Sequence, residues 1–224
     1  MIHTAPGGAV PRLYYHPGNA NIAPHVVLEE IGAPFELELV DRQNDAHKSA
    51  AYLALNPNGA IPVLVDGEVV LYESAAICLY LADMHPEAAL VPALRTPERA
   101  QCYKWLFWCT NTLQAMLMHY FYPERIVDDG DDAAANQVRQ KAEQRIAPML
   151  DQLDAQLASH GGAWMLASGY SVVDPFALML CRWTRNHTRP ARSLPRLGPY
   201  LARMLERPAV QRMFAAENLS PPLV

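Results

Sequence analysis

The sequence has few features that direct a protein into a membrane, onto nucleic acid or out of the cell. No apolar run approaches the ~20 residues that a membrane-spanning helix needs. Lys and Arg form no dense cluster, and the net charge of −5 disfavours nucleic acid and anionic membranes as main partners. Residues 1–11 lack both the basic start and the apolar centre of a secretion signal, so we expect a flexible extension and a cytoplasmic protein.

Cysteine is also scarce. The four cysteines lie inside apolar helical patterns without Cys-x-x-Cys spacing, and they are Cys78, Cys102, Cys109 and Cys181. This arrangement predicts buried, reduced thiols, because disulfide frameworks and zinc sites depend on closely spaced or paired cysteines. We therefore expect no metal site.

Apolar residues, in contrast, are plentiful. Of the 224 residues, 51% are hydrophobic and 18% are charged, which is typical of a well-packed soluble protein. A proline-rich stretch predicts a linker at 87–97 between a first domain at 12–86 and a second domain at 98–224.

The first domain mixes strand and helix patterns. Two predicted strands separated by a predicted helix indicate a crossover connection. In order, we expect a strand at Arg12–Tyr15, a helix at Asn21–Gly32, a half-buried strand at Phe35–Val40, a helix at about Asp45–Leu55, a hairpin at Val63–Leu71 that turns at Asp66-Gly67, and a helix at Glu73–Met84.

The second domain is predicted to be all α, because every long segment after the linker has helical periodicity. The segment Pro97–Tyr122 is rich in aromatic residues, and Asp132–His160 is a long amphipathic stretch. Ser171-Val-Val-Asp174 matches a capping box, in which the serine oxygen accepts from a backbone N–H and the aspartate satisfies another. One side of the amphipathic stretch carries Ile146, Leu150, Leu153 and Leu157.

Two short motifs predict a site for a small peptide. A cis Ile61-Pro62 bond would turn the Ile61 backbone N–H and C=O outward, where an extended peptide pairs with them like an added strand. The hairpin that follows returns Glu73 and Ser74 beside Pro62. These two residues open a helix, and the free N–H groups of a helix start attract a carboxylate.

The pair of motifs resembles the glutathione site of the cytosolic glutathione transferases, and the similarity runs from about Arg12 to about Phe214. The family implies a thioredoxin-like α/β N-terminal domain followed by an all-α C-terminal domain. It also implies glutathione as co-substrate and a homodimer, with the first domain of one chain against the helices of the other.

The resemblance also implies roles for single residues. Ile61, next to Pro62, would pair with the cysteinyl part of glutathione, while Glu73 and Ser74 would hold its γ-glutamyl end. His47 lies where theta- and delta-class relatives carry a histidine that contacts the glycyl carboxylate.

The glutathione sulfur would then point at the turn between the first strand and the first helix. This turn resembles that of bacterial beta-class members, but Ala20 stands where that class carries cysteine. Without a thiol there, a mixed disulfide with glutathione cannot form at this position. Gln114 and Ala115 lie roughly where that class carries a His-Lys pair, a second departure that weakens assignment to it. The chain resembles a beta- or theta-like member that lacks the beta-class cysteine, and its class stays open.

Activation of the sulfur requires one good hydrogen-bond donor. Lowering a thiol pKa by two from about 8.5 takes about 2.7 kcal/mol, which one hydrogen bond to a charged group supplies. Strand side chains alternate, so at most one of Tyr14 and Tyr15 reaches the sulfur. The candidate donors, between which the residues do not decide, are Tyr14, Tyr15, the ring of His16, Asn19 and Asn21.

The implied activity is conjugation of the glutathione thiolate to a small hydrophobic electrophile, as in detoxification. Two alternatives stay open: a glutathione-binding or ligand-carrying protein with little catalysis, and a glutathione-dependent isomerase or peroxidase. The electrophile would lie between the domains against Tyr103, Phe107, Trp108 and Asn111, with Met118 as a further candidate.

Overall fold

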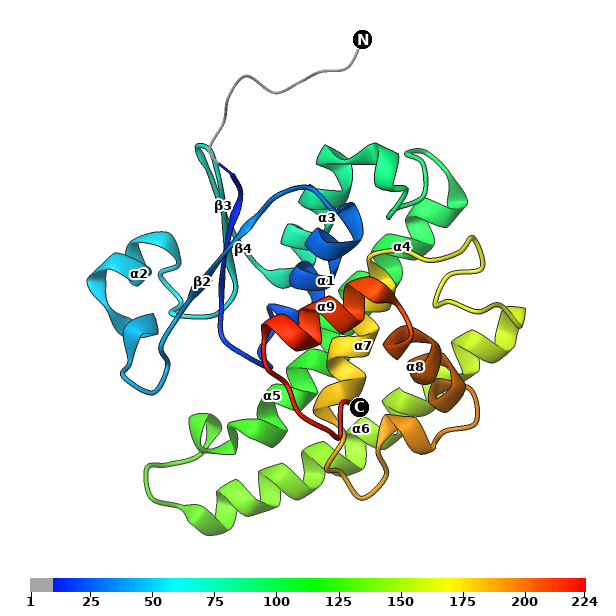
Figure 1. Ribbon diagram of the computed structural model, residues 1–224. Coiled ribbons are helices and arrows are strands. Elements are labelled where there is room, and N and C mark those ends of the chain that lie inside the picture. Colours follow the sequence, from blue (N-terminus) through cyan, green and yellow to red (C-terminus); the bar gives the residue numbers. More distant parts are fainter. Residues whose placement is uncertain (1–9) are drawn as a thin grey trace.

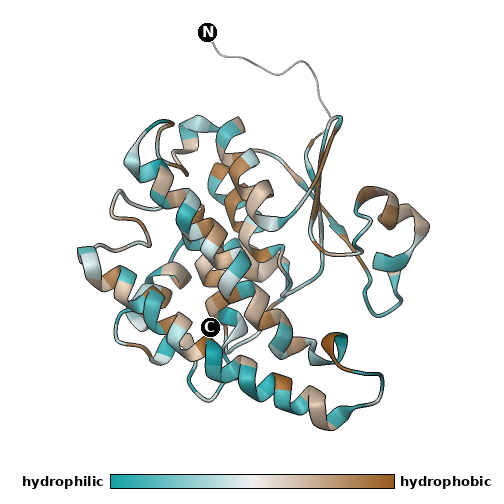
Figure 2. Cartoon of the chain, turned by 180° about the vertical axis from the view of Figure 1, so that it is seen from behind, coloured by the Kyte–Doolittle hydropathy of each residue, from teal (hydrophilic) through white to brown (hydrophobic). Residues whose placement is uncertain are grey.

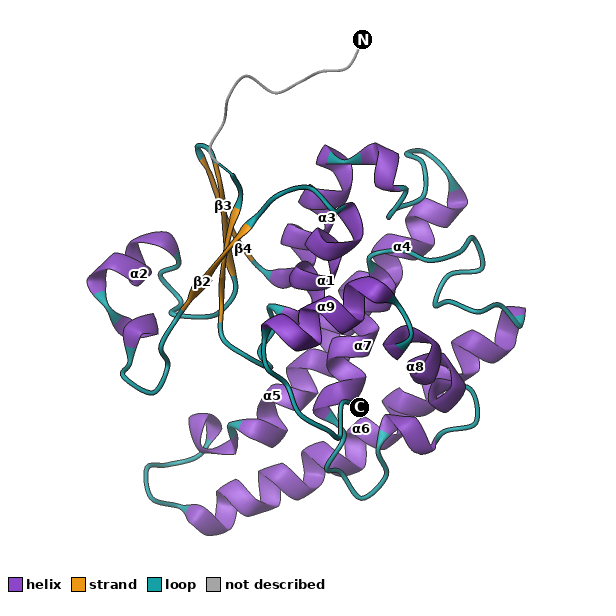
Figure 3. Cartoon of the chain, viewed as in Figure 1, coloured by secondary structure: helices purple, strands orange, loops and turns teal. Residues whose placement is uncertain are grey.

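The computed structural model describes residues 10–224, so most of the extension predicted at 1–11 lies outside the described residues. A four-stranded sheet with the order β2-β1-β3-β4 forms one side of the molecule, and helices form the rest (Figure 3). The strands β1 and β2 pair in parallel, whereas β3 pairs antiparallel with both β1 and β4. The strands are β1 (Arg12–Tyr15), β2 (Glu36–Leu39), β3 (Val63–Asp66) and β4 (Val69–Tyr72).

Helices cover both faces of this sheet. On one face lie α1 (Ile22–Ile31) and α3 (Ser74–Met84), and on the other lies the short α2 (Ala50–Leu55) (Figure 1). Helix α1 provides the crossover between the parallel strands, and it ends at Gly32, whose φ of +73° suits glycine. The predicted order of strand, helix and strand is therefore confirmed.

The remaining part of the chain is helical. Among residues 10–224 no helix combines the length and the apolar character that crossing a membrane requires. In Figure 2 the helices are hydrophobic mainly where they pack together and hydrophilic at the periphery. The elements are α4 (Pro97–Trp108), a π-helical segment (Cys109–Gln114), α5 (Ala115–Phe121), α6 (Asp132–His160), α7 (Val173–Trp183), α8 (Leu197–Leu205) and α9 (Pro208–Ala216), with short 3-10 turns at Ala46–Lys48, Pro86–Ala88, Pro123–Ile126 and Ala191–Ser193.

The sheet and the helical part share one hydrophobic core. This core includes Leu13 of β1, Val26 of α1, Phe176 of α7 and Met213 of α9. The four apolar residues predicted along α6 are buried, and so are all four cysteines. The predicted fold class, a thioredoxin-like α/β part followed by an all-α part, is confirmed.

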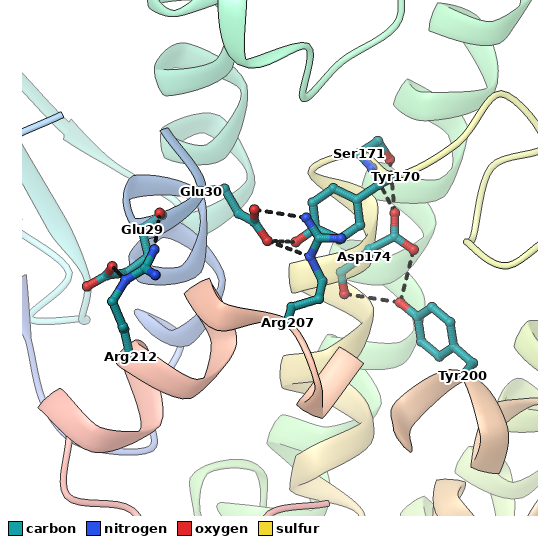
Figure 4. A network of polar contacts seen from close by, with 8 residues as sticks. All are labelled: Glu29, Glu30, Tyr170, Ser171, Asp174, Tyr200, Arg207 and Arg212. Atoms are coloured by element: carbon teal, nitrogen blue, oxygen red, sulfur yellow. Dashed lines mark hydrogen bonds and ion pairs between the residues drawn. The ribbon is translucent and has the colours of Figure 1, made fainter. Parts of the chain in front are cut away.

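The start of α7 is a hydrogen-bonded capping box, as predicted. The Asp174 carboxylate accepts from the backbone N–H of Ser171 at 2.8 Å and from that of Met165 at 2.9 Å. The Tyr200 hydroxyl donates to this carboxylate at 3.1 Å (Figure 4). The Ser171 hydroxyl accepts from the Val173 N–H at 3.3 Å. Burial raises the pKa of Asp174 to about 6, and these hydrogen bonds only partly oppose it.

Ion pairs beside this box tie α1 to α9. Arg207 forms a two-point contact with the Glu30 carboxylate, at 2.6 and 2.9 Å, and the Tyr170 hydroxyl donates to the same carboxylate at 2.9 Å. Arg212 pairs with Glu29 at 2.5 Å (Figure 4). The contacts join the thioredoxin-like part to the last helix.

Three elements differ from the sequence prediction in more than a terminal residue of a helix or strand. Asp66 pairs with Val69, so the hairpin turn lies one residue later, at residues 67–68, where Gly67 has a φ of +59°. The helix predicted at Asp45–Leu55 divides because the Ser49 hydroxyl accepts from Tyr52 N–H and starts α2 anew. The helix predicted across Pro97–Tyr122 contains the π-helical segment, which periodicity did not indicate.

Candidate active site between the sheet and the helical part

A pocket of about 340 Å³ lies between the two parts of the chain. One side comes from the turn after β1 and from the loops after β2 and α2. The other side comes from α5, the loop after it, and the end of α7. The lining residues are Gly18, Asn19, Ala20, Arg42, His47, Asn58, Gly59, Ala60, Ile61, Gln114, Met118, Phe121, Tyr122, Arg125, Trp183 and Arg185.

Ile61 forms part of the pocket wall, and the Ile61–Pro62 bond is cis, as predicted. The loop before it is held by two hydrogen bonds, because the Tyr52 hydroxyl and the Asn56 amide both donate to the Ala60 carbonyl at 2.8 Å. Within residues 10–224, the backbone N–H and C=O of Ile61 make no hydrogen bond. They are therefore available to a ligand.

The start of α3 lies beside this loop. Val63 pairs with Tyr72, so Pro62 and Glu73 are the next residues on neighbouring strands. Glu73 has a positive φ of +74°, which non-glycine residues adopt mainly at turns and functional sites. The Ser74 hydroxyl donates to the Ala20 carbonyl at 2.8 Å, which joins the helix start to the turn after β1. Glu73 and Ser74 do not line the pocket itself.

Asn19 presents its amide group to the pocket in a defined orientation. Its Oδ1 accepts from Arg42 Nη1 at 2.9 Å. A guanidinium only donates, so the oxygen of the amide must face Arg42 and the NH₂ group must face away from it. Within the described part of the chain this NH₂ group donates to no acceptor. The residue therefore keeps a free donor at the pocket wall.

Asn21, unlike Asn19, has both polar atoms of its amide group in hydrogen bonds within the protein. It is fully buried, its Oδ1 accepts from the His16 N–H at 3.1 Å, and its Nδ2 donates to Glu217 at 2.7 Å. Glu217, which is also buried, accepts from the Gly18 N–H at 2.9 Å and from His25 Nδ1 at 2.8 Å. Asn21 thus anchors the turn after β1 to the end of the chain.

Sequence reasoning missed Glu217, since it lies 196 residues from Asn21 and carries no local motif. Sequence reasoning also missed Arg42, which lies 23 residues from Asn19 and likewise carries no local motif. Neither contact is signalled by residue spacing.

Tyr14 and Tyr15 face opposite sides of the sheet, as strand alternation predicted. The Tyr14 ring packs against Tyr52 with centroids 6.1 Å apart, and the Tyr15 ring packs against His25 at 6.4 Å. Neither tyrosine lines the pocket. Burial, followed by the charge of Glu217, raises the pKa of Tyr15, so its hydroxyl stays neutral.

The two histidines near the turn have distinct surroundings. His16 Nδ1 donates to the Val40 carbonyl at 2.9 Å, which orients its ring. His47 lines the pocket, and its Nδ1 has no partner within residues 10–224. Burial, and then the charge of Arg42, lower the pKa of His47. Both causes disfavour the imidazolium in the absence of an anion.

The four residues predicted to hold the electrophile do not reach this pocket. Tyr103 lies under Arg99, Trp108 packs against Trp105, and the side chain of Phe107 is 62% exposed. Asn111 is exposed as well. The predicted candidate that does line the pocket is Met118, together with Phe121 and Trp183.

A π-helical segment separates three of the four predicted residues from the part of the helix that lines the pocket. A π-helix has more residues per turn than an α-helix, so it rotates the residues that follow relative to a continuous α-helix. Gln114, the last residue of the segment, faces the pocket. Among the described residues of this long helix, those that line the pocket begin at Gln114.

Comparisons with known proteins agree with this geometry. The family model for the N-terminal domain of glutathione S-transferases matches residues 23–84. Glutathione S-transferase 3 of Zea mays is 33% identical over 94% of this chain and 96% of its own length. A bacterial beta-class glutathione S-transferase of Sphingomonas chungbukensis is 29% identical, with a TM-score of 0.79 over 93% of this chain and 100% of that one.

A sphingomonad glutathione S-transferase, solved in complex with glutathione, is 28% identical. Its TM-score is 0.78, over 93% of this chain and 100% of that chain. The similarity to the maize protein extends over nearly all of both sequences, and the described fold agrees with it. The chain belongs to the glutathione S-transferase family of enzymes.

Proposed function

We propose that the protein conjugates glutathione to a small electrophile with an apolar body. The observation that carries this proposal is the pocket, where a free peptide edge at Ile61, a free amide donor at Asn19 and apolar side chains meet. In the reaction, the thiolate forms a C–S bond with the electrophile, a leaving group such as chloride departs, and the thiol proton passes to solvent. The glutathione complex of the sphingomonad relative supports glutathione as the co-substrate.

Glutathione would lie along the thioredoxin-like side of the pocket. Its cysteinyl part pairs with the backbone of Ile61 beside Pro62. Its γ-glutamyl carboxylate meets Ser74 and the start of α3, while its ammonium group meets Glu73. The helix α3 has 11 residues, and its first N–H groups have no side-chain cap to compete with the ligand.

The glycyl carboxylate would meet His47. The unpartnered Nδ1 of His47 and the position of the residue in the pocket support this assignment. An anion there would also offset the burial and the neighbouring Arg42 charge that lower the pKa of the histidine.

Asn19 is the donor that we assign to the thiolate. Its NH₂ group is oriented by Arg42 and has no acceptor within the described residues. The hydrogen-bonding atoms of Asn21, by contrast, are engaged with His16 and Glu217. Tyr14 and Tyr15 lie outside the pocket lining.

The electrophile would lie against Met118, Phe121 and Trp183 instead of the residues first predicted. We further propose a cytoplasmic location, a division into domains at 12–86 and 98–224, and a beta- or theta-like class without the beta-class cysteine. Ala20 supports the class assignment, since it lines the pocket where a cysteine would face the sulfur.

Two measurements test the proposed function. We expect calorimetry to detect glutathione binding and steady-state assays to detect conjugation of 1-chloro-2,4-dinitrobenzene. Binding without turnover would instead favour the glutathione-binding carrier, and absence of binding would refute both. Ser74→Ala should weaken glutathione binding, whereas Ser159→Ala, an exposed serine on α6, serves as the matched control.

We also propose a homodimer. β4 is an edge strand of the sheet, and its Val69 and Val70 are exposed, as is Phe107 of α4. Covering such apolar groups favours packing of the sheet edge of one chain against the helices of a second. Light scattering should give twice the mass of 24.9 kDa, and Phe107→Asp should shift the protein toward the monomer.

A further inference from the structure

The pocket carries an excess of positive charge. Four of its lining residues are basic and none is acidic: they are Arg42, His47, Arg125 and Arg185. The chain as a whole has a net charge of −5, so this excess is local. Within residues 10–224, none of the three arginines forms an ion pair with a carboxylate, whereas Arg12, Arg99, Arg189, Arg207 and Arg212 all do.

The four basic groups divide between the two sides of the pocket. Arg42 and His47 lie on the thioredoxin-like side, where the proposed function places the glycyl carboxylate of glutathione. Arg125 and Arg185 lie on the helical side, next to Phe121 and Trp183. Glutathione carries two carboxylates, and the second is assigned to the start of α3. The two arginines of the helical side are therefore left without an assigned anion.

Both arginines are held in place by neutral groups. The guanidinium of Arg125 lies 4.0 Å from the centre of the Tyr122 ring. Arg185 Nη1 donates to the Arg182 carbonyl at 3.1 Å, which leaves most of its donors unused. Arg182, three residues before Arg185, is buried, and its guanidinium donates to the backbone carbonyls of Pro222 and Leu223. Within the described residues neither Arg125 nor Arg185 pairs with a carboxylate, although the charge of the buried Glu217 acts on Arg182.

We infer that the electrophile carries a carboxylate, which Arg185 and Arg125 bind while its apolar body packs against Phe121 and Trp183. This inference rests on the proposed function and narrows its substrate class from apolar electrophiles to apolar acids. Guanidinium groups bind carboxylates through paired, charge-assisted hydrogen bonds. The two arginines lie on the side of the pocket opposite the residues that we assign to glutathione.

The experiment compares two electrophiles that differ in charge. 4-Chloro-3-nitrobenzoate is ionised at pH 7, and 4-chloro-3-nitrobenzamide is its neutral counterpart. The readout is the ratio of kcat/KM for the acid to kcat/KM for the amide, measured for the natural sequence, for Arg185→Gln and for Arg125→Gln. The intrinsic reactivities of the two compounds cancel when the ratio is compared between variants. Arg145→Gln, an exposed arginine on α6, makes the same change in net charge as a control.

We expect the ratio to fall about 10- to 100-fold in Arg185→Gln and by a smaller factor in the exposed Arg125→Gln, because charge-assisted hydrogen bonds are lost. The Arg145→Gln control should keep the ratio. An unchanged ratio in the two pocket variants would overturn the inference. A raised KM for glutathione with no change in the acid-to-amide ratio would also overturn the inference, because the arginines would then bind glutathione.

A binding measurement keeps the inference testable if neither compound is conjugated. Calorimetry on the glutathione-saturated protein would then compare 3-nitrobenzoate with 3-nitrobenzamide. Tighter binding of the benzoate by tenfold or more, lost in Arg185→Gln, would support the anion site although the transferase proposal had failed. Equal binding of the two compounds would overturn the anion site, whatever the outcome for catalysis.

Discussion

Asn19 illustrates how a neighbour orients the amide group of a single side chain. Arg42 holds its Oδ1 at 2.9 Å and so directs its NH₂ group away from that contact. We expect Asn19→Ala to raise the pKa of the bound glutathione thiol by about 1 to 2, and to lower kcat/KM about 10- to 100-fold, because one charge-assisted hydrogen bond contributes about 1.5 to 3 kcal/mol. The pH dependence of kcat/KM and the thiolate absorbance measure both effects.

The control for this prediction is Asn136→Ala. Asn136 also accepts from an arginine, Arg139 at 3.1 Å, but it lies exposed on α6. Its loss should leave both quantities unchanged. An unaltered thiol pKa in Asn19→Ala would remove Asn19 as the activator.

The cysteines give a second prediction at the residue scale. All four are buried, and burial raises the pKa of each thiol, to about 11 for Cys102 and about 12 for Cys181. Because the thiolate is the reactive form, we expect negligible reaction of the native protein with Ellman's reagent at pH 8 and reaction of all four after denaturation. Ala20→Cys would place a thiol in the pocket wall and should react readily; rapid reaction of the natural sequence would contradict the prediction.

At the scale of one element, the capping box makes the stability of the start of α7 depend on pH. Burial raises the folded-state pKa of Asp174 from 3.8 to about 6. A carboxyl with a raised folded pKa stabilises the fold fully below its unfolded pKa, and this contribution is lost as the pH rises through the folded value. The relevant window is therefore about pH 4 to 6.

We expect Asp174→Asn to remove this dependence. The difference in unfolding free energy between the natural sequence and the variant should be larger at pH 4 than at pH 7, by about 3 kcal/mol. Urea unfolding at the two pH values measures it. Asp132→Asn, at the exposed start of α6, is the matched control. A difference that does not change with pH would show that Asp174 titrates normally.

At the scale of the whole molecule, Glu217 connects the end of the chain to the turn that carries the site. Its buried carboxylate accepts from Gly18, Asn21 and His25. We expect Glu217→Gln to lower the free energy of unfolding by about 1 to 3 kcal/mol. The glutamine amide has one oxygen that accepts hydrogen bonds, whereas the carboxylate has two. We also expect weaker glutathione binding, because the turn loses its anchor.

Urea unfolding and calorimetry with glutathione measure these two effects. Glu206→Gln changes an exposed carboxylate after α8 and should alter neither. If the Glu217→Gln variant were less stable but bound glutathione with unchanged affinity, Glu217 would stabilise the fold without affecting the glutathione site.

Local signals in the sequence were enough to predict most elements. The strand β1 was predicted with its observed bounds, the capping pattern identified the start of α7, and the cis Ile61–Pro62 bond was predicted from its local motif. Each of these signals depends on residues that are neighbours in the chain. The π-helical segment has no such signal, and the pocket residues of the long helix were predicted too early in the chain.

The sequence alone therefore determined the elements, their order and the backbone edge at Ile61, since propensity, capping and hairpin pairing act over a few residues. The tertiary structure decided which donor faces the pocket and how it is charged. Arg42 orients the Asn19 amide although the two residues are 23 positions apart, and Glu217 accepts a hydrogen bond from Asn21 across 196 positions. Folding also brings Arg125 and Arg185 to the same pocket. Contacts of this kind depend on packing, which no spacing along the chain encodes.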